Sequence, residues 1–298
     1  MHSLLSSLNL SAADLKPLGQ AENFTFQIYL QGRPHLLRLS PQARYTPEQR
    51  QTERELVGSL RPDLLFTVQR PLPFPDGKWS QQVQFQDRAY VASLWEFLEG
   101  TFLEHPTLAQ MQALGAATAH FHRRALAFVK HHPAPRPQFQ VPVLVKDLLI
   151  QEHDVFHLHD LLLTFSQHME QGKLQMALIH GDLHQSNYLF QEDRPGFIDF
   201  DDCQHAPLVM EWAATLAHQS HREDFDDVQQ AYFAGYFLMF PEMRDQLAFL
   251  PLAVVVRRLW LMEWAWVRKD TSYLKDFVQD YLQHHLQQLH HDLKHLNN

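Results

Sequence analysis

Apolar and polar residues alternate along two stretches of the first hundred residues. Residues 24–30 read FTFQIYL, and residues 35–39 resume the alternation after a turn at Gly32. Aromatic and β-branched side chains at every second position favour strands, and Gly and Pro between them favour a tight turn. The pattern therefore predicts a β-hairpin. Two further strands are expected at 79–85 and 89–97.

One helix is expected between this hairpin and the later strands. Thr46 suits the N-cap position, Pro47 suits the first turn, and Gln49 completes a capping box. The helix is expected to extend to about Leu60. The first hundred residues thus combine an antiparallel sheet with a single helix.

After Gly100 the apolar residues recur at the three- and four-residue spacing of helices. One short hairpin interrupts this pattern, with strands at 188–190 and 197–200. Helical stretches are expected from 106 onward and again at 145–170, 207–219, 223–239, 245–268 and 272–295.

These elements predict an α+β protein with two lobes. A small antiparallel-sheet lobe with one helix, residues 1–94, precedes a large and mostly helical lobe, residues 101–298. Residues 95–100 are expected to form a hinge between the two.

Composition narrows the class of protein. The formal net charge is −9, so the chain has no basic surplus with which to bind nucleic acid. A single cysteine, Cys203, indicates a reducing compartment. No signal-peptide pattern is present, and no apolar run reaches the roughly 18 residues of a membrane span. We therefore expect a cytoplasmic protein without a membrane partner; the oligomeric state is not indicated.

The candidate chemistry lies in two motifs, HGDLHQSN at 180–187 and IDFDD at 198–202. Pairing of the short hairpin would bring Asn187, just before its first strand, near Asp199, expected inside its second. Asp182 lies five residues before Asn187 on a loop. Amide and carboxylate oxygens are ligands that Mg²⁺ prefers, and a further carboxylate can accept a hydroxyl proton. The motifs predict phosphoryl transfer, with Asp182 as the base.

With ENF at 22–24 and RRLWLMEWAW at 257–266, these motifs resemble the aminoglycoside phosphotransferase and choline kinase family, which has a protein-kinase-like fold. The nearest branch is that of the bacterial stress-response kinase and the homoserine-kinase type, and the likeness covers about residues 15–268. It implies transfer of the γ-phosphoryl of ATP, with Mg²⁺, to a hydroxyl. The acceptor is either a small molecule or a Ser/Thr side chain.

The resemblance also implies roles for further residues. Asn23 belongs to the nucleotide loop. Arg38 stands where most kinases have Lys, and it would bind nucleotide phosphate and pair with Glu53 on the capped helix. The backbone around Glu96 and Phe97 would bind the adenine. Supporting or substrate-contacting roles fall to His180, His184, Asp201 and Asp202.

Two features leave a second interpretation open. Arg38 replaces the usual Lys, and the nucleotide loop at 18–23 contains one glycine, so that fewer backbone amides can approach the phosphates. A pseudokinase or nucleotide-sensing module without transfer activity is the alternative. Glu211 stands where relatives usually show Asp, and we expect it to support the catalytic loop.

Overall fold

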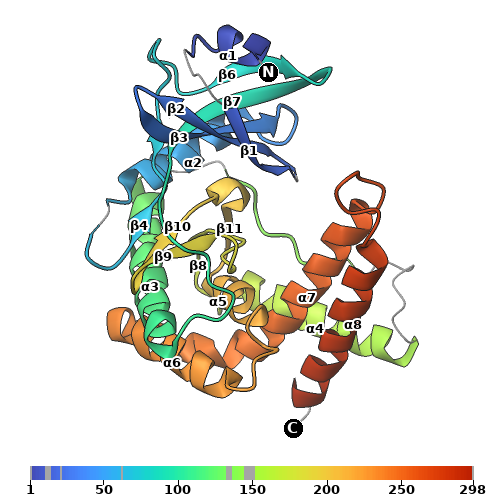
Figure 1. Ribbon diagram of the computed structural model, residues 1–298. Coiled ribbons are helices and arrows are strands. Elements are labelled where there is room, and N and C mark those ends of the chain that lie inside the picture. The colour runs from blue at the N-terminus through green and yellow to red at the C-terminus, as the bar shows by residue number, and fades with distance from the viewer. Residues whose placement is uncertain are drawn as a thin grey trace.

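The computed structural model describes residues 2–10, 15–20, 22–61, 63–131, 136–143 and 152–296. A sheet occupies the top of the molecule and helices occupy the bottom (Figure 1). The α+β class and the two-lobed, kinase-like arrangement are therefore confirmed. The first part of the helix predicted at 145–170 lies outside the described residues. Within them, each helix is too short or too polar to cross a membrane.

The small lobe is built on one antiparallel sheet. The predicted hairpin is present, with Thr25 opposite Arg38 and Leu30 opposite Arg33. Its inner face buries Phe26 and Leu37. The strands run in the order β1 (Leu15–Gln20), β2 (Phe24–Leu30), β3 (Arg33–Pro41), β7 (Arg88–Glu96) and β5 (Pro71–Leu72), with β6 (Gln81–Phe85) also on β7.

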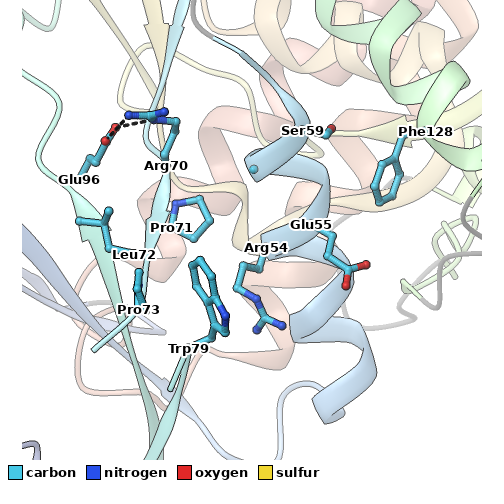
Figure 2. A pocket seen from close by; sticks show the side chains of 11 residues that line it. Arg54, Glu55, Ser59, Arg70, Pro71, Leu72, Pro73, Trp79, Glu96 and Phe128 are labelled. Atoms are coloured by element: carbon cyan, nitrogen blue, oxygen red, sulfur yellow. Dashed lines mark hydrogen bonds and ion pairs between the residues drawn. The ribbon is translucent and has the colours of Figure 1, made fainter. Parts of the chain in front are cut away.

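The helix of this lobe, α2 (Pro47–Ser59), begins with the predicted capping box. The Gln49 N–H donates to Thr46 Oγ1 at 3.3 Å, and the Thr46 N–H donates to Gln49 Oε1 at 3.0 Å. A cavity of about 760 Å³ separates part of α2 from β5 (Figure 2). A short helix, α1 (His2–Ser7), packs near β6.

Two small sheets support the catalytic motifs within the helical lobe. The strands β9 (Tyr188–Gln191) and β10 (Arg194–Phe197) form the predicted hairpin, and β4 (Thr67–Val68) adds in parallel to β10. The strands β8 (Met176–Ile179) and β11 (Gln204–Pro207) pair beside them.

The helices of this lobe enclose those sheets. The helix predicted at 245–268 begins as a 3-10 helix, η2 (Pro241–Phe249), because Pro251 opens the α-helical part. The last predicted helix starts later than residue 272. The helices are α3 (Leu108–His131), α4 (Glu152–Glu170), α5 (Leu208–Ala217), α6 (Phe225–Met239), α7 (Leu250–Val267) and α8 (Val278–Leu296).

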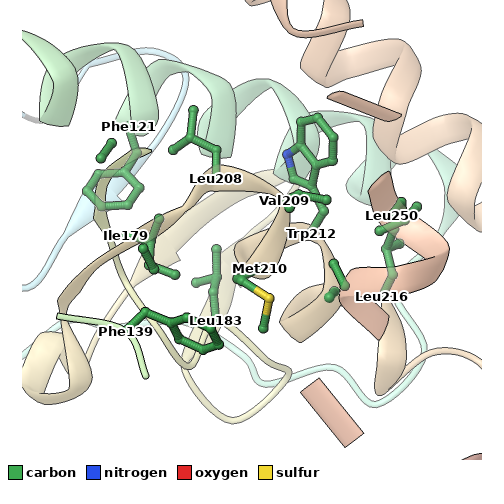
Figure 3. Close-up of a cluster of buried hydrophobic side chains, with 14 of the residues drawn as sticks. Phe121, Phe139, Ile179, Leu183, Leu208, Val209, Met210, Trp212, Leu216 and Leu250 are labelled. Atoms are coloured by element: carbon green, nitrogen blue, oxygen red, sulfur yellow. The ribbon is translucent and has the colours of Figure 1, made fainter. Parts of the chain in front are cut away.

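A single large core joins these helices to α2. Helix α5 is buried along its whole length, and its Leu208, Trp212 and Leu216 lie among side chains of several elements (Figure 3). Helices α3 and α6 approach closely because Gly115 has no Cβ, which would lie 1.9 Å from the Tyr232 oxygen. These packed helices form the core against which the segment bearing the catalytic loop packs. The boundaries at 94, 95–100 and 101 stay predictions.

Candidate active site

A cleft of about 640 Å³ lies between the sheet of the small lobe and helices α7 and α8. Aromatic residues of α7 and of the following segment, including Trp260, Trp264 and Tyr273, form one wall. The sequence-predicted residues that line the cleft are Asn23, Asp182, His184, Asn187, Asp199, Asp201 and Asp202.

The catalytic loop follows β8 and turns sharply at Gly181. This residue has φ +87°, and a Cβ there would lie 2.3 Å from the Asp202 carbonyl oxygen, so only glycine fits. Glu211 of α5, fully buried, accepts from the N–H groups of His180 at 2.5 Å and Gly181 at 3.2 Å. The His180 ring contacts the Ile198 carbonyl oxygen at 2.8 Å. The geometry thus matches the support expected of Glu211.

Asp182 is held from three sides. Arg257 Nη2 lies 2.6 Å from Oδ1, His184 Nε2 lies 3.2 Å from Oδ2, and the Asn187 amide donates to Oδ2 at 3.1 Å. Burial alone would raise the pKa of Asp182, but His184 and Arg257 outweigh it and hold the pKa well below its usual range. Asp182 is therefore an ionised carboxylate near neutral pH.

Asp199 lies just beyond the hairpin, and the prediction that it sits inside the second strand is wrong. Pairing ends with Phe197 opposite Tyr188, and the chain then enters a 3-10 turn, η1 (Phe200–Asp202). Asp199 takes the left-handed conformation, φ 58° and ψ 62°, which is strained for a residue with a Cβ and typical of functional sites. This conformation leaves its side chain 43% exposed and part of the cleft lining.

Asn187 lies beside Asp199 because the Ile198 N–H donates to the Asn187 carbonyl at 3.1 Å. The Asn187 amide nitrogen is used by Asp182, so its Oδ1 is left for another partner. Among the described residues, no group of three or more His, Cys, Asp or Glu could hold a metal ion. The oxygens of Asn187 and Asp199 fit a hard divalent cation that takes its remaining ligands from phosphate and water.

Arg38 connects the small lobe to Asp199 and Asp201 of the IDFDD motif. Its Nη2 donates to Glu53 Oε1 at 2.7 Å, and its Nη1 lies 3.5 Å from Asp199 Oδ1 and 3.7 Å from Asp201 Oδ1. The guanidinium is 4.7 Å from the centre of the Trp95 ring. Burial opposes the charge, but Glu53 and the two aspartates raise the pKa of Arg38 above its usual value. The guanidinium thus lies among three carboxylates, with its two terminal nitrogens directed at different partners.

Asp201 and Asp202 are both bound from the small lobe. Buried Asp201 accepts from Asn23 Nδ2 at 2.9 Å, and Arg44 Nη1 is 3.0 Å from its Oδ2. Arg44 Nη2 donates to Asp202 Oδ1 at 2.6 Å. Burial, opposed by Arg44 and reinforced by Asp182, raises the pKa of Asp202 to about 7.

Glu22 joins the nucleotide loop to α7 across the cleft. The Trp264 Nε1–H donates to Glu22 Oε1 at 3.1 Å, and Glu22 also forms ion pairs with Arg44 and Arg268. The sequence patterns alone indicate no role for Glu22, Arg44 or Arg257. Arg257 and Trp264 share a face of α7, seven residues apart, and this helical spacing was the available signal.

The predicted hinge residues lie away from these groups. Glu96 ends β7, its N–H donates to the Arg70 carbonyl at 2.8 Å, and its carboxylate accepts two hydrogen bonds from the Arg70 guanidinium. Neither Glu96 nor Phe97 lines the cleft. An adenine contact at Glu96 would therefore fall to its carbonyl, and the role of both residues stays a prediction.

Comparisons with known proteins bear on this site. A microcompartment-associated aminopropanol kinase superimposes with a TM-score of 0.74 and 21% identity, over 92% of this chain and 90% of that chain. An amicoumacin kinase in complex with AMP-PNP, Ca²⁺ and Ami has a TM-score of 0.71 and 18% identity. The match covers 91% of this chain and 87% of that chain. An ethanolamine kinase from Plasmodium vivax has a TM-score of 0.58 and 15% identity, and the match covers 93% of this chain and 82% of that chain. The comparison with curated proteins found no match.

The sequence comparison is more decisive than these structural likenesses. The model of the family described as "Phosphotransferase enzyme family" matches residues 14–250, which is most of the chain. The resemblance to aminoglycoside phosphotransferases is confirmed, whereas the narrower branch stays a prediction. The chain belongs to the phosphotransferase enzyme family and is a kinase.

Proposed function

We propose that the protein transfers the γ-phosphoryl of Mg²⁺-bound ATP to the hydroxyl of a small amino alcohol. The observation that carries this proposal is the arrangement around Asp182. An ionised carboxylate, fixed by Arg257 and His184, lies beside Asn187 in the cleft that also holds Asp199. Phosphoryl transfer asks of a protein mainly positioning and charge neutralisation, and this arrangement supplies both.

In the proposed reaction, Asp182 accepts a hydrogen bond from the acceptor hydroxyl and orients its oxygen toward the phosphoryl group. Its lowered pKa makes it a weak base, so the proton moves to it late, as bond formation to phosphorus proceeds. Arg38, held by Glu53, stabilises negative charge on the phosphates. Asn187 and Asp199 would hold a divalent cation, which neutralises phosphate charge when bound.

The far wall of the cleft supports this acceptor class. Tyr273 and Phe277 offer aromatic surface there, and Asp202, which is paired with Arg44 through Oδ1, adds a carboxyl group close to Asp182. An amino alcohol would place its hydroxyl at Asp182 and its ammonium between the rings and Asp202. The ring faces of the two tryptophans are less available, because Arg257 and Arg268 already lie over them. Similar proteins named for aminopropanol and ethanolamine support this choice.

An acceptor screen with purified protein tests the proposal. Aminopropanol, ethanolamine, choline, homoserine, methylthioribose, an aminoglycoside and a generic Ser/Thr protein are each offered with ATP or GTP, with and without Mg²⁺. We expect Mg²⁺-dependent transfer to an amino alcohol, reduced about 10²-fold or more in Asp182→Ala and in Asp199→Ala. Equal background turnover of nucleotide in the wild type, Asp182→Ala and Asp199→Ala would indicate a nucleotide-binding module. Transfer only to the Ser/Thr protein would refute the small-molecule acceptor.

A further inference from the structure

A second cavity lies between α2 and β5, and none of Asp182, Asn187 and Asp199 lines it. It measures about 760 Å³, within the range of small-molecule sites. One wall is apolar, formed by Pro71, Leu72, Pro73 and Trp79, and the other is the outer surface of α2 (Figure 2). Of the residues given a role in phosphoryl transfer, only Glu96, whose carboxylate is paired with Arg70, lines this space.

The wall of the cavity carries two arginines and two glutamates, so its formal charges balance. Arg70 and Glu96 neutralise each other through two hydrogen bonds, at 2.9 and 2.6 Å, and exposed Glu55 accepts the Gln51 amide at 2.7 Å. Arg54 is different: across the described part of the chain its guanidinium has no hydrogen bond or ion pair. It lies 5.4 Å from the centre of the Trp79 ring. Half-buried in the cavity wall, it is a cation prepared for a carboxylate.

Gly58, the exposed next-to-last residue of α2, also lines the cavity. It does not have a left-handed φ, and a Cβ there would meet nothing within 4 Å. Neither backbone conformation nor close packing therefore requires glycine at this position. Its effect is to keep the α2 wall of the cavity bare.

The cavity is connected to the nucleotide site through α2. Glu53 and Arg54 are consecutive: Glu53 binds Arg38, whereas Arg54 faces the cavity. Arg54 and Trp79 also line a small space whose opposite wall includes Arg38, Glu53 and Trp95. A ligand that pairs with Arg54 would therefore shift α2, the helix that positions Glu53 for its ion pair with Arg38.

We propose that this cavity is a second ligand site, which binds an aromatic carboxylate between Trp79 and Arg54 and thereby changes the affinity of the nucleotide site. The ring system packs on Trp79 and the proline wall, and the carboxylate pairs with Arg54. The coupling rests on the proposed nucleotide binding, whereas the ligand site itself does not. By thermodynamic linkage, nucleotide must change the affinity for the carboxylate by the same factor.

The test uses 1-naphthoate as the probe and 1-naphthamide as its neutral counterpart, measured by isothermal titration calorimetry on the full chain. We expect naphthoate to bind about tenfold or more tightly than the amide, because only the carboxylate forms a charge-assisted bond. Arg54→Gln should reduce naphthoate binding to the level of the amide. Gly58→Leu, whose Cβ would meet nothing within 4 Å, adds a side chain to the cavity wall and should abolish binding of both while the protein stays folded.

Asp199→Ala separates this site from the cleft, since it alters the cleft and should leave naphthoate binding unchanged. Loss of binding in Asp199→Ala, equal affinity for the two probes, or unchanged binding in both Arg54→Gln and Gly58→Leu would overturn the site. The Kd for Mg²⁺–AMP-PNP with and without saturating naphthoate tests the coupling. An equal Kd in both conditions would overturn the coupling, and failure of AMP-PNP to bind at all would count instead against the proposed function.

Discussion

The catalytic strip at 180–202 and the loop between β1 and β2 face each other across the cleft, and they are held in different ways. The strip is fixed by its own backbone: Gly181 turns it, buried Glu211 binds two of its N–H groups, and β9 and β10 close it. The loop is fixed mainly by two side chains, Glu22 and Asn23, which reach to the opposite lobe. Backbone hydrogen bonds inside a core resist change, whereas the loop has fewer contacts, and Glu22 and Arg44 among them are partly exposed to solvent.

This difference suggests a division of labour. The backbone of the strip is organised in advance for the acceptor and the metal, because its hydrogen bonds lie within the helical lobe. The side chains of Asp201 and Asp202 are also bound from the small lobe. The loop can open to admit a nucleotide, since opening costs only a few polar contacts at the cleft surface. The three variants that follow test this division, beginning with the largest expected effect.

Glu211→Gln should damage the strip most. The change replaces one acceptor oxygen by a donor that faces the backbone N–H of His180 or Gly181 in a fully buried position. We expect a loss of about 2–3 kcal/mol in the free energy of unfolding, measured by urea denaturation, and a more than tenfold loss of transfer rate. Glu223→Gln, at an exposed residue, is the control and should stay within about 0.5 kcal/mol. A loss in Glu211→Gln no larger than the control's would contradict this account of the strip.

Arg257→Gln should change the acid side of the pH profile. Arg257 is one of two groups that hold the pKa of Asp182 below its usual range despite burial, so its removal raises that pKa. The acid limb of kcat against pH should therefore move to higher pH, and kcat at neutral pH should fall about tenfold as Asp182 loses its fixed orientation.

The sign of the stability effect is also defined. Because the folded-state pKa of Asp182 is lowered, the stabilisation is present above the unfolded pKa of about 4 and is lost as pH falls below it. Arg257→Gln should lose less stability on acidification than wild type. Arg244→Gln is the matched control, because the Arg244 guanidinium lies over Phe237 and is not among the groups that shift the pKa of Asp182. An acid limb at the same pH in both variants would show that Arg257 does not set the pKa of Asp182.

Glu22→Gln should have the smallest effect on stability and a selective effect on binding. It removes the ion pairs to Arg44 and Arg268 and leaves the strip intact. We expect a threefold to tenfold rise in the KM for nucleotide, because the lost loop contacts contribute roughly 1 kcal/mol to nucleotide binding. The kcat should change little. Glu242→Gln, at an exposed residue without an ion pair among those described, serves as the comparison. A fall in kcat with unchanged KM would mean that the loop takes part in the chemical step.

The same contrast explains what could be predicted from the sequence. The hairpin, the capping box at Thr46 and the order of the catalytic motifs were predictable, because each depends on residues that lie near one another in the sequence. The pairing of Arg38 with Glu53 followed from the family resemblance and is present at 2.7 Å.

Longer-range features were not predictable from local pattern. The contacts of Glu22 with Trp264 and of Arg257 with Asp182 join residues 242 and 75 positions apart. The left-handed turn at Asp199 was missed because the apolar residues around it continue the alternation of a strand, whereas tertiary packing ends the pairing at Phe197. The short strand β4 was not predicted, because it is a strand only through its parallel pairing with the distant β10.

The central claim is that Asn187 and Asp199 share one divalent cation while Asp182 faces the acceptor. Crystals grown with AMP-PNP and Mn²⁺, which substitutes for Mg²⁺ on oxygen ligands, allow the metal to be located by anomalous scattering. We expect a peak about 2.1 Å from Asn187 Oδ1 and from an Asp199 carboxylate oxygen, beside the nucleotide phosphates, with Asp182 not bound to the metal. A metal bound elsewhere, or Asn187 and Asp199 turned into separate spaces with nucleotide present, would contradict the claim.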